Sequence, residues 1–417
     1  MKSIWRGLLP FCLSCMIVCA YGQPSWHAQP CPVDGDLVSV SFASPYSGWA
    51  VTSEGTVVHT SNGGWLWNSI AELPDVYPEK IVFTDTLTGW LAVNAIGVTD
   101  TALILKTVDG GQHWTENYRA LKSKLYDLFF LNDTLAWAVG YVIDPADTIG
   151  LRLYTANGGE TWRVQDTGIS VATPYTSITF RDPLVGDLCG PGPVLMHTGT
   201  GGETVPGWSL DIKQIDRPVY DMIDVGDQYG CMVGADGKII FTRDRWTNFF
   251  YDDFYVNGDT LWSVDGNDTP VFWMVGEAGT ILYMGYNPLL GAIVQDQSLD
   301  ISENLYEVDV LDETHVWAVG QSGTILFFGD QGDNSLPERS LSDNTLLFPN
   351  PAKDITWLRR TGTGADVLKV YSQNAKLVLE IEIPEGRTEI PVSLKGIEPG
   401  MYFVRTGHRS LLLLVSE

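Results

Sequence analysis

The sequence predicts an all-β protein in which a seven-bladed β-propeller is followed by a small C-terminal β-sandwich. The main observation is a short apolar segment, best written Gly-Trp-Ala-Val, that recurs with the tryptophan or its equivalent at positions 49, 90, 137, 187, 231, 273 and 317. The steps run from 41 to 50 residues, and a period in the forties with several strands per unit is typical of propeller blades. A second observation is a change of composition after about residue 330. We therefore expect the propeller over 23–330, a linker over 331–345 and a second unit over 346–417.

Each repeat is expected to form a four-stranded antiparallel sheet. In the third repeat, apolar segments at 125–131, 135–140 and 151–155 and a fourth segment from Arg163 are separated by Gly, Asn and Asp, which favour turns. The second segment is apolar throughout instead of alternating, as expected for a sheet that is covered on both faces. Neighbouring blades of a propeller cover each other's sheets in this way.

Three repeats carry the same turn before the fourth strand, at 60–67, 107–114 and 155–162. An Asn or Asp in this turn can hydrogen-bond the turn's own backbone, two glycines can take positive φ, and the closing tryptophan can pack into the edge of the blade. We expect these residues to be structural rather than catalytic: Asn62, Trp67, Asp109, Trp114, Asn157 and Trp162.

The seventh repeat ends without a fourth strand. After its third strand at 323–328 the chain turns polar, whereas residues 24–30, ahead of the first repeat, hold a tryptophan followed by potential strand residues. We expect this N-terminal strand to close the last blade, because closure removes the last exposed sheet edge.

Residues 1–22 have the pattern of a secretory signal peptide. Lys2 and Arg6 precede an apolar stretch that is too short to cross a bilayer, and small residues stand before Gln23, as at a cleavage site. After removal of this signal, the sequence predicts no transmembrane segment.

Charge and cysteine content exclude several classes of function. The net charge is −26, from 51 acidic and 25 basic residues, so a nucleic-acid partner would be repelled. Cys31, Cys189 and Cys231 remain after the signal, none with a Cys or His companion at zinc-ligand spacing. We therefore expect no metal site and no cofactor.

The C-terminal unit contains a Pro349-Asn350-Pro351 turn at its start and a Gly400-Met401-Tyr402 strand near its end. Its short apolar segments predict a small antiparallel sandwich. The apolar segment 411–415 is too short to span a membrane and is expected to be a core strand.

These motifs resemble two known families. The recurring turn is similar to the Asp box, or bacterial neuraminidase repeat, and together with the Gly-Trp-Ala-Val strand it makes the propeller resemble the photosystem II stability and assembly factor family, whose members are seven-bladed. The tail resembles the type A C-terminal sorting domain of the type IX secretion system of Bacteroidota. That resemblance implies the secretion machinery as a partner, and a secreted or cell-surface location.

Two functions remain open at the level of sequence. The first is a non-catalytic binding or scaffold propeller for a protein or glycan. The alternative is an extracellular glycoside hydrolase of the sialidase-like Asp-box type, since Asp-box propellers include sialidases. A sialidase needs an arginine cluster for the substrate carboxylate, and the seven arginines of the propeller form no recognisable sialidase motif. We therefore favour the binding function.

Asp187 is the strongest single candidate for a binding residue. It replaces tryptophan in a second strand, and a buried acid must be paired, exposed in a channel or functional. Arg181 and Arg217 lie close to it in the predicted arrangement of blades four and five and are candidate partners. A local ion pair without further function is the alternative.

Overall fold

The computed structural model describes most of the chain between residues 25 and 415. The described residues are 25–97, 100–143, 148–165, 171–192, 194–203, 207–211, 215–246, 251–255, 258–267, 270–289, 291–329, 346–348, 352–359, 366–372, 377–397, 399–406 and 409–415. The chain divides into two compact units, Pro24–Gly329 and a unit that contains the residues from Asp330 onward. Each is described by itself. The predicted signal peptide and linker lie outside the described residues.

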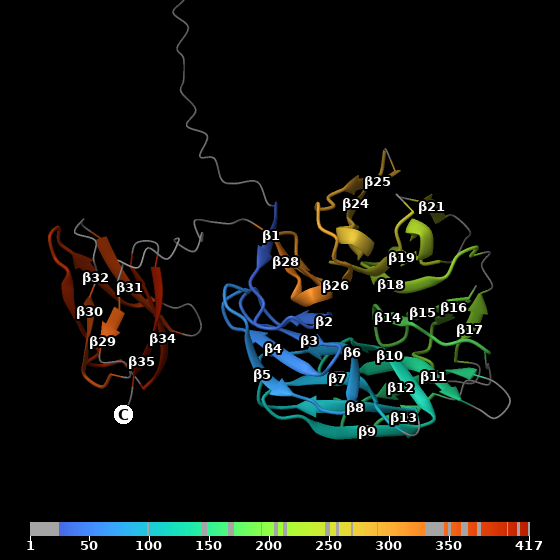
Figure 1. Cartoon of the computed structure of the whole chain (residues 1–417), viewed down its shortest axis with the longest axis horizontal. Coiled ribbons are helices and arrows are strands. Elements are labelled where there is room, and N and C mark those ends of the chain that lie inside the picture. Colours follow the sequence, from blue (N-terminus) through green and yellow to red (C-terminus); the bar gives the residue numbers. More distant parts are fainter. Residues whose placement is uncertain are drawn as a thin grey trace, which may run out of the picture. The chain divides into compact units, whose positions relative to one another are not determined.

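The first unit is a ring of seven blades, each a four-stranded antiparallel sheet whose strands follow one another from the centre outward (Figure 1). Blade one consists of β2 (Leu37–Phe42), β3 (Gly48–Thr52), β4 (Thr56–Thr60) and β5 (Asn68–Glu72). Blade two consists of β6 (Val76–Phe83), β7 (Gly89–Ala95), β8 (Thr101–Thr107) and β9 (Thr115–Leu121). Blade three consists of β10 (Ser123–Phe130), β11 (Ala136–Ile143), β12 (Thr148–Thr155) and β13 (Arg163–Val164).

The remaining blades follow the same order. Blade four consists of β14 (Ser177–Phe180), β15 (Gly186–Gly190), β16 (Val194–Thr198) and β17 (Ser209–Asp211). Blade five consists of β18 (Val219–Val225), β19 (Tyr229–Gly234), β20 (Lys238–Thr242) and β21 (Tyr251–Tyr255). Blade six consists of β22 (Leu261–Gly266), β23 (Val271–Gly276), β24 (Ile281–Asn287) and β25 (Gly291–Asp296). The predicted fold class is therefore confirmed.

Blade seven joins both ends of the propeller. It contains β26 (Leu305–Asp312), β27 (His315–Gly320) and β28 (Ile325–Gly329), and β1 (Ser25–Gln29) pairs antiparallel with β28 as its fourth strand. Trp26 of β1 packs edge-on against Trp273 at a ring distance of 5.3 Å. The N-terminal strand thus covers the edge that β28 would otherwise expose.

Aromatic stacks join neighbouring blades at the seams. Trp49 in the second strand of blade one lies face to face with Phe83 at the end of the first strand of blade two, with ring centroids 3.6 Å apart and planes 6° apart. A tryptophan from the turn of blade two, Trp114, then meets Phe83 edge-on at 6.0 Å. The same three-ring arrangement recurs at two other seams: Trp137, Phe180 and Trp208; Trp317, Phe42 and Trp67. At a further seam Trp90, Phe130 and Trp162 make a similar group, in which the planes of Trp90 and Phe130 are tilted by 31°.

The three Asp-box turns share one hydrogen-bond pattern. In blade two, Thr107 Oγ1 donates to Asp109 Oδ1 at 2.9 Å and accepts from the N–H of Gly111 at 3.0 Å, while Asp109 Oδ1 accepts from the N–H of His113 at 3.0 Å. The corresponding contacts are present around Asn62 and Asn157. Gly110 and Gly111 have φ of +75° and +88°, which explains their residue type.

The second unit contains two sheets around one core. A three-stranded sheet has the order β29 (Leu346–Phe348), β30 (Ile355–Arg359), β33 (Glu389–Ser393). A four-stranded sheet has the order β32 (Leu377–Ile383), β31 (Asp366–Ser372), β34 (Gly400–Thr406), β35 (Arg409–Val415). Tyr402 belongs to the shared core, and Gly400 begins β34. Pro349, Asn350 and Pro351 lie outside the described residues.

Candidate functional site

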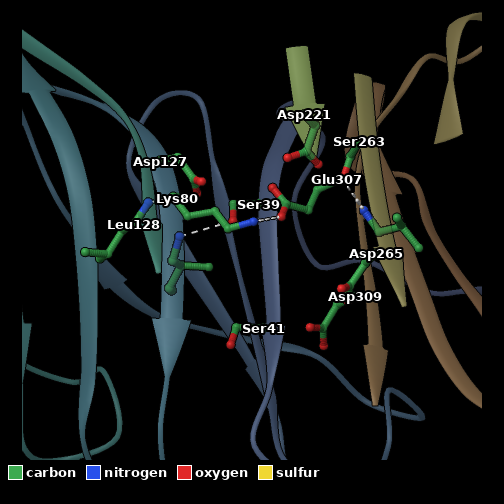
Figure 2. Close-up of polar contacts among 12 residues, drawn as sticks. Ser39, Ser41, Lys80, Asp127, Leu128, Asp221, Ser263, Asp265, Glu307 and Asp309 are labelled. Atoms are coloured by element: carbon green, nitrogen blue, oxygen red, sulfur yellow. Dashed lines mark hydrogen bonds and ion pairs between the residues drawn. The ribbon is translucent and has the colours of Figure 1, made fainter. Parts of the chain in front are cut away.

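The inner strands of the seven blades line a central channel with polar side chains. One residue from each inner strand stands ten positions before the tryptophan-equivalent residue of its repeat. These seven residues, which we call the channel ring, are Ser39, Lys80, Asp127, Ser177, Asp221, Ser263 and Glu307. All of them except Ser177 are labelled in Figure 2. Two positions further along the strands, Ser41, Thr179, Asp265 and Asp309 form a second polar level. The cavity between them has a volume of about 220 Å³.

Five of the seven channel-ring side chains accept a backbone hydrogen bond from the next blade. Ser39 Oγ accepts a hydrogen bond from the N–H of Ile81 in blade two at 3.1 Å, and Asp127 Oδ2 accepts from the N–H of Ile178 in blade four at 2.9 Å. Ser177, Asp221 and Ser263 bond the following blades in the same way. The innermost strand of each sheet has backbone N–H groups on the channel side, where no further strand can accept their hydrogen bonds. The side chains supply these acceptors, and a buried N–H group without an acceptor would destabilise the fold.

The second level repeats this arrangement. Asp265 Oδ2 accepts from the N–H of Val310 at 2.7 Å, and Asp309 Oδ2 accepts from the N–H of Phe42 at 2.9 Å across the closing seam of the ring. Blade two uses a different residue, since Asn94 accepts from the N–H of Leu125 in blade three at 3.0 Å. The channel acids therefore act as acceptors that hold the ring together.

Lys80 is the one cation of the channel ring and forms an ion pair with Glu307 across the channel (Figure 2). Burial by itself would lower the pKa of Lys80, but the carboxylates of Glu307, Asp127 and Asp221 outweigh burial, and the pKa is raised. Burial raises the pKa of Glu307 to about 7, although Lys80 opposes this shift. The channel thus holds one lysine against five carboxyl groups.

The acids of the second level also have raised pKa values. Burial raises the pKa of Asp265 to about 6, against two backbone hydrogen bonds that favour the ionised form. Burial and the neighbouring carboxylate of Asp265 raise the pKa of Asp309 well above its ordinary value. Burial in the channel therefore favours the protonated forms of these carboxyl groups.

A second group of buried acids lies at the seam between blades four and five. Asp187 is fully buried on β15, and its Oδ1 lies 3.0 Å from Nδ1 of His197 on the neighbouring strand. Asp224 on β18 lies close enough to Asp187 for each carboxyl group to affect the pKa of the other, and its Oδ1 accepts from Nε1 of Trp246 at 2.9 Å. Oδ2 of each acid is buried and has no hydrogen-bond partner among the described residues. Burial raises the pKa of Asp187 to about 7, and burial together with Asp187 raises the pKa of Asp224 well above its ordinary value. Burial of two neighbouring carboxyl groups therefore favours their protonated forms.

The two predicted arginine partners of Asp187 lie at different places. The charge of Arg181 lowers the pKa of both Asp187 and Asp224, so Arg181 is close to the pair. Arg217 precedes the opposite end of β18, where its Nε lies 2.9 Å from Oδ2 of Asp236. The structure brings Asp187 together with Arg181, His197 and Asp224, and it does not bring Arg217 to them.

The channel ring was not identified from the sequence, although a signal for it exists. Each of its residues is polar and stands at a constant spacing before the tryptophan-equivalent position.

Within the described residues, no group of three or more His, Cys, Asp or Glu side chains is arranged to hold a metal ion. No helix in the described part of the chain has the length and apolar character needed to cross a membrane.

Comparisons with known proteins agree with both predicted resemblances. Residues 346–411 match the family described as Secretion system C-terminal sorting domain, which indicates secretion or attachment to the cell surface through the type IX system. Over 159 residues the chain is 28% identical to the Photosystem II assembly lipoprotein Ycf48 of Synechococcus sp. (strain CC9902). That match covers 37% of this chain and 44% of the relative, so the chain spans less than half the length of this curated relative.

Solved structures support the same fold. A structure of YCF48 bound to D1 peptide superimposes with a TM-score of 0.58 at 17% identity, covering 74% of this chain and 98% of that one. YCF48 from Cyanidioschyzon merolae gives a TM-score of 0.55 at 17% identity, covering 73% and 99%. The chain is therefore a Ycf48-like seven-bladed β-propeller that carries a secretion system C-terminal sorting domain.

Proposed function

We propose that this protein is an exported, non-catalytic binding propeller and that its ligand is a segment of polypeptide. The observation that carries this proposal is the engagement of the channel acids. Asp127, Asp221, Asp265 and Asp309 each accept a backbone N–H of the next blade, and Glu307 is paired with Lys80. Acids that hold the ring together are poorly suited to repeated proton transfer.

The small size of the channel argues against an active site that hydrolyses a glycoside. Ligand pockets generally have volumes of about 300 to 1,000 Å³, whereas the channel cavity has about 220 Å³. A canonical glycosidase needs two opposed carboxyl groups on either side of a sugar ring. The space between the channel acids favours a single extended group over a pyranose with its neighbours.

A relative of the same fold gives a reason to favour polypeptide over glycan. YCF48 has been solved bound to D1 peptide, so a propeller of this kind can take a peptide. The pathway of that relative does not transfer to this chain, because the sorting domain directs this propeller out of the cell. What we carry over is the class of ligand.

The full-length protein should be incubated in parallel with a random peptide array, a glycan array and a panel of chromogenic glycosides. We expect saturable binding to a subset of peptides and no turnover of any glycoside. Binding to glycans alone would replace polypeptide by carbohydrate as the ligand. Turnover that is lost in Asp187→Asn or Glu307→Gln variants would instead support the glycoside hydrolase alternative.

A further inference from the structure

The seam between blades five and six lacks the aromatic stack found at four other seams. There, a tryptophan of the second strand packs against a phenylalanine at the end of the next blade's first strand. At this seam the equivalent positions hold Cys231, which pairs with Phe241, and Gly266, which pairs with Phe272. Two large rings are therefore absent between β19 and β22.

Blade six also lacks the turn that covers the second-strand tryptophan at those seams. In blade two the Asp-box turn reaches back to blade one, where the carbonyl of Gly110 accepts from Nε1 of Trp49 at 2.8 Å. In blade six, β24 continues through the equivalent positions to Asn287, which pairs with Gly291 across a short hairpin. Tyr286 stands where the turns have Asp or Asn. The sequence of blade six thus supplies no glycine pair and no closing tryptophan for this seam.

A hollow of about 310 Å³ lies at this seam. Its lining comes from both blades, from the start of β19, the end of β20 and the end of β24: Gln228, Tyr229, Arg243, Asp244 and Tyr286. The rings of Tyr229 and Tyr286 are 5.3 Å apart, and both contact the buried ring of Phe241. Ligand pockets generally have volumes of about 300 to 1,000 Å³, so the hollow is large enough for a small ligand or one large side chain.

Polar groups border the aromatic wall of the hollow. The guanidinium group of Arg243 lies over the ring of Tyr286, with Cζ 5.8 Å from the ring centroid. Gln228 is exposed and offers an amide oxygen. At the seam between blades three and four, Oε1 of Gln165 accepts from Nε1 of the closing tryptophan, Trp208, at 3.2 Å. The hollow therefore combines aromatic faces with the kind of acceptor that this fold uses for an indole N–H.

We propose that this hollow binds one aromatic side chain, preferably tryptophan, of a partner polypeptide. The bound ring packs against Tyr229 and Tyr286, as the closing tryptophans of other blades pack at their seams, and its N–H donates to Gln228. Aromatic pairs attract each other beyond the area they bury, and tryptophan is a frequent anchor at protein interfaces. The inference deepens the proposed binding function and rests on it, because it names the side chain that anchors the polypeptide.

Three blocked pentapeptides test this proposal against the full-length protein, with ligand-observed NMR and calorimetry. Their central residue is tryptophan, cyclohexylalanine or alanine, flanked by glycines. We expect saturable binding of the tryptophan peptide, binding of the cyclohexylalanine peptide about fivefold more weakly because its ring has no π face, and no binding of the alanine peptide. No binding of the tryptophan peptide, or equal binding of the tryptophan peptide and either of the others, would overturn the proposal.

Matched variants locate the site. Tyr286→Leu should weaken binding of the tryptophan peptide about tenfold. Gln228→Ala, at an exposed loop position, should weaken it about fivefold and serves as the second variant if the first fails to fold. Tyr46→Leu removes an aromatic ring that is 69% exposed and lies outside the hollow, and should leave binding unchanged.

The outcomes separate this inference from the proposed function. If array peptides bind but their affinity is the same in Tyr286→Leu and Gln228→Ala, the hollow is wrong and the proposed function stands. If glycans bind, no peptide binds and glycan binding is lost in Tyr286→Leu, the hollow holds carbohydrate and the inference is overturned. If no peptide binds in either assay, both fail.

Discussion

Asp187 and Asp224 meet across the seam between blades four and five at the place where four other seams pack a tryptophan against a phenylalanine. Asp224 stands opposite Gly230 in the pairing of β18 with β19, as Phe180 stands opposite Gly186 in β14 and β15. The adjacent turn is also altered, since Arg245 and Trp246 have φ of +62° and +58° where other turns have glycines. At this seam, two neighbouring buried acids thus occupy the positions that hold two aromatic rings at the other four seams.

This pair makes the stability of the propeller decrease as the pH rises from about 5 to about 8. Both carboxyl groups have folded-state pKa values above the unfolded value, so the stability they contribute is present below the unfolded pKa and is lost as pH rises toward about 7 and beyond. We expect the melting temperature to fall between pH 5 and pH 8. In Asp224→Asn the amide can still donate to Asp187 and no second charge forms, so the fall should be smaller.

Thermal unfolding followed by circular dichroism at several pH values checks this prediction. Asp227→Asn is the control, because the side chain of Asp227 is 95% exposed on the loop after β18. Identical pH profiles for wild type and Asp224→Asn would contradict raised pKa values at this seam.

The stacked rings at the other seams should carry much of the stability of the ring. Trp49 is fully buried and contacts both Phe83 and the turn of blade two, where its Nε1 donates to the carbonyl of Gly110 at 2.8 Å. Trp49→Ala should lower the free energy of unfolding by about 3 to 5 kcal/mol, as large-to-small core changes do. Denaturant unfolding measures this loss. The control variant Leu66→Ala, at a position that is 56% exposed, should lower the free energy of unfolding only slightly. A loss below about 1 kcal/mol would argue against the seam as a core.

The fold could be predicted from the sequence because each blade of a propeller repeats the same strand pattern at a nearly regular interval along the chain. The tryptophan-equivalent positions give the number of blades, and the turn around Asp109 reports local hydrogen bonds that depend on residues only a few positions apart. The contacts between neighbouring blades were harder to predict. Asp187 is conspicuous in a strand that otherwise has tryptophan, but its partner Asp224 lies in the next blade and was not identified from the sequence.

The channel was missed for a different reason. Its polar residues alternate with core residues as they would on any half-buried strand, so no single blade identifies them. Only the comparison of all repeats shows that Ser39, Asp127 and Glu307 occupy equivalent positions. Arg217 illustrates a different difficulty. It directly precedes β18 in the sequence, but it lies at the start of that strand, whereas Asp224 lies at its other end. Direction along a strand decides which neighbours meet.

The hydrogen bonds across the seams predict a measurable cost when one acceptor is removed. Ser39→Ala leaves the buried N–H of Ile81 without its acceptor, and we expect destabilisation of about 1 to 3 kcal/mol, the usual penalty for an unsatisfied buried donor. Hydrogen exchange at the amide of Ile81 should accelerate in the variant. Ser302→Ala, at an exposed position before β26, is the matched control, and equal stability of the two variants would contradict the role of Ser39.

The sorting domain should be needed for export and dispensable for folding of the propeller. Deletion of 346–417 leaves the unit Pro24–Gly329 intact, so its melting temperature should stay the same while surface or extracellular protein is lost in a host with a type IX system. Immunoblots of cell and medium fractions measure the loss. Tyr402→Ala, which opens the core of the tail, should reduce export in the same direction, and undiminished export of the deletion variant would exclude this route.

The ion pair of Lys80 and Glu307 gives the sharpest test of the channel. Lys80→Met removes the one cation of the channel ring and leaves five carboxyl groups unbalanced, so we expect a loss of about 3 to 5 kcal/mol at pH 8. The double variant Lys80→Met, Glu307→Gln removes one of those charges and should recover part of the loss. Burial raises the pKa of Glu307 to about 7 although Lys80 opposes this shift, so the pKa of Glu307 should be higher still in Lys80→Met. Protonation at pH 5 relieves the repulsion, and the single variant should be less destabilised there than at pH 8. Lys122→Met, at an exposed position, should be neutral at both pH values. If the destabilisation caused by Lys80→Met does not change with pH, it results from lost packing and not from unbalanced charge.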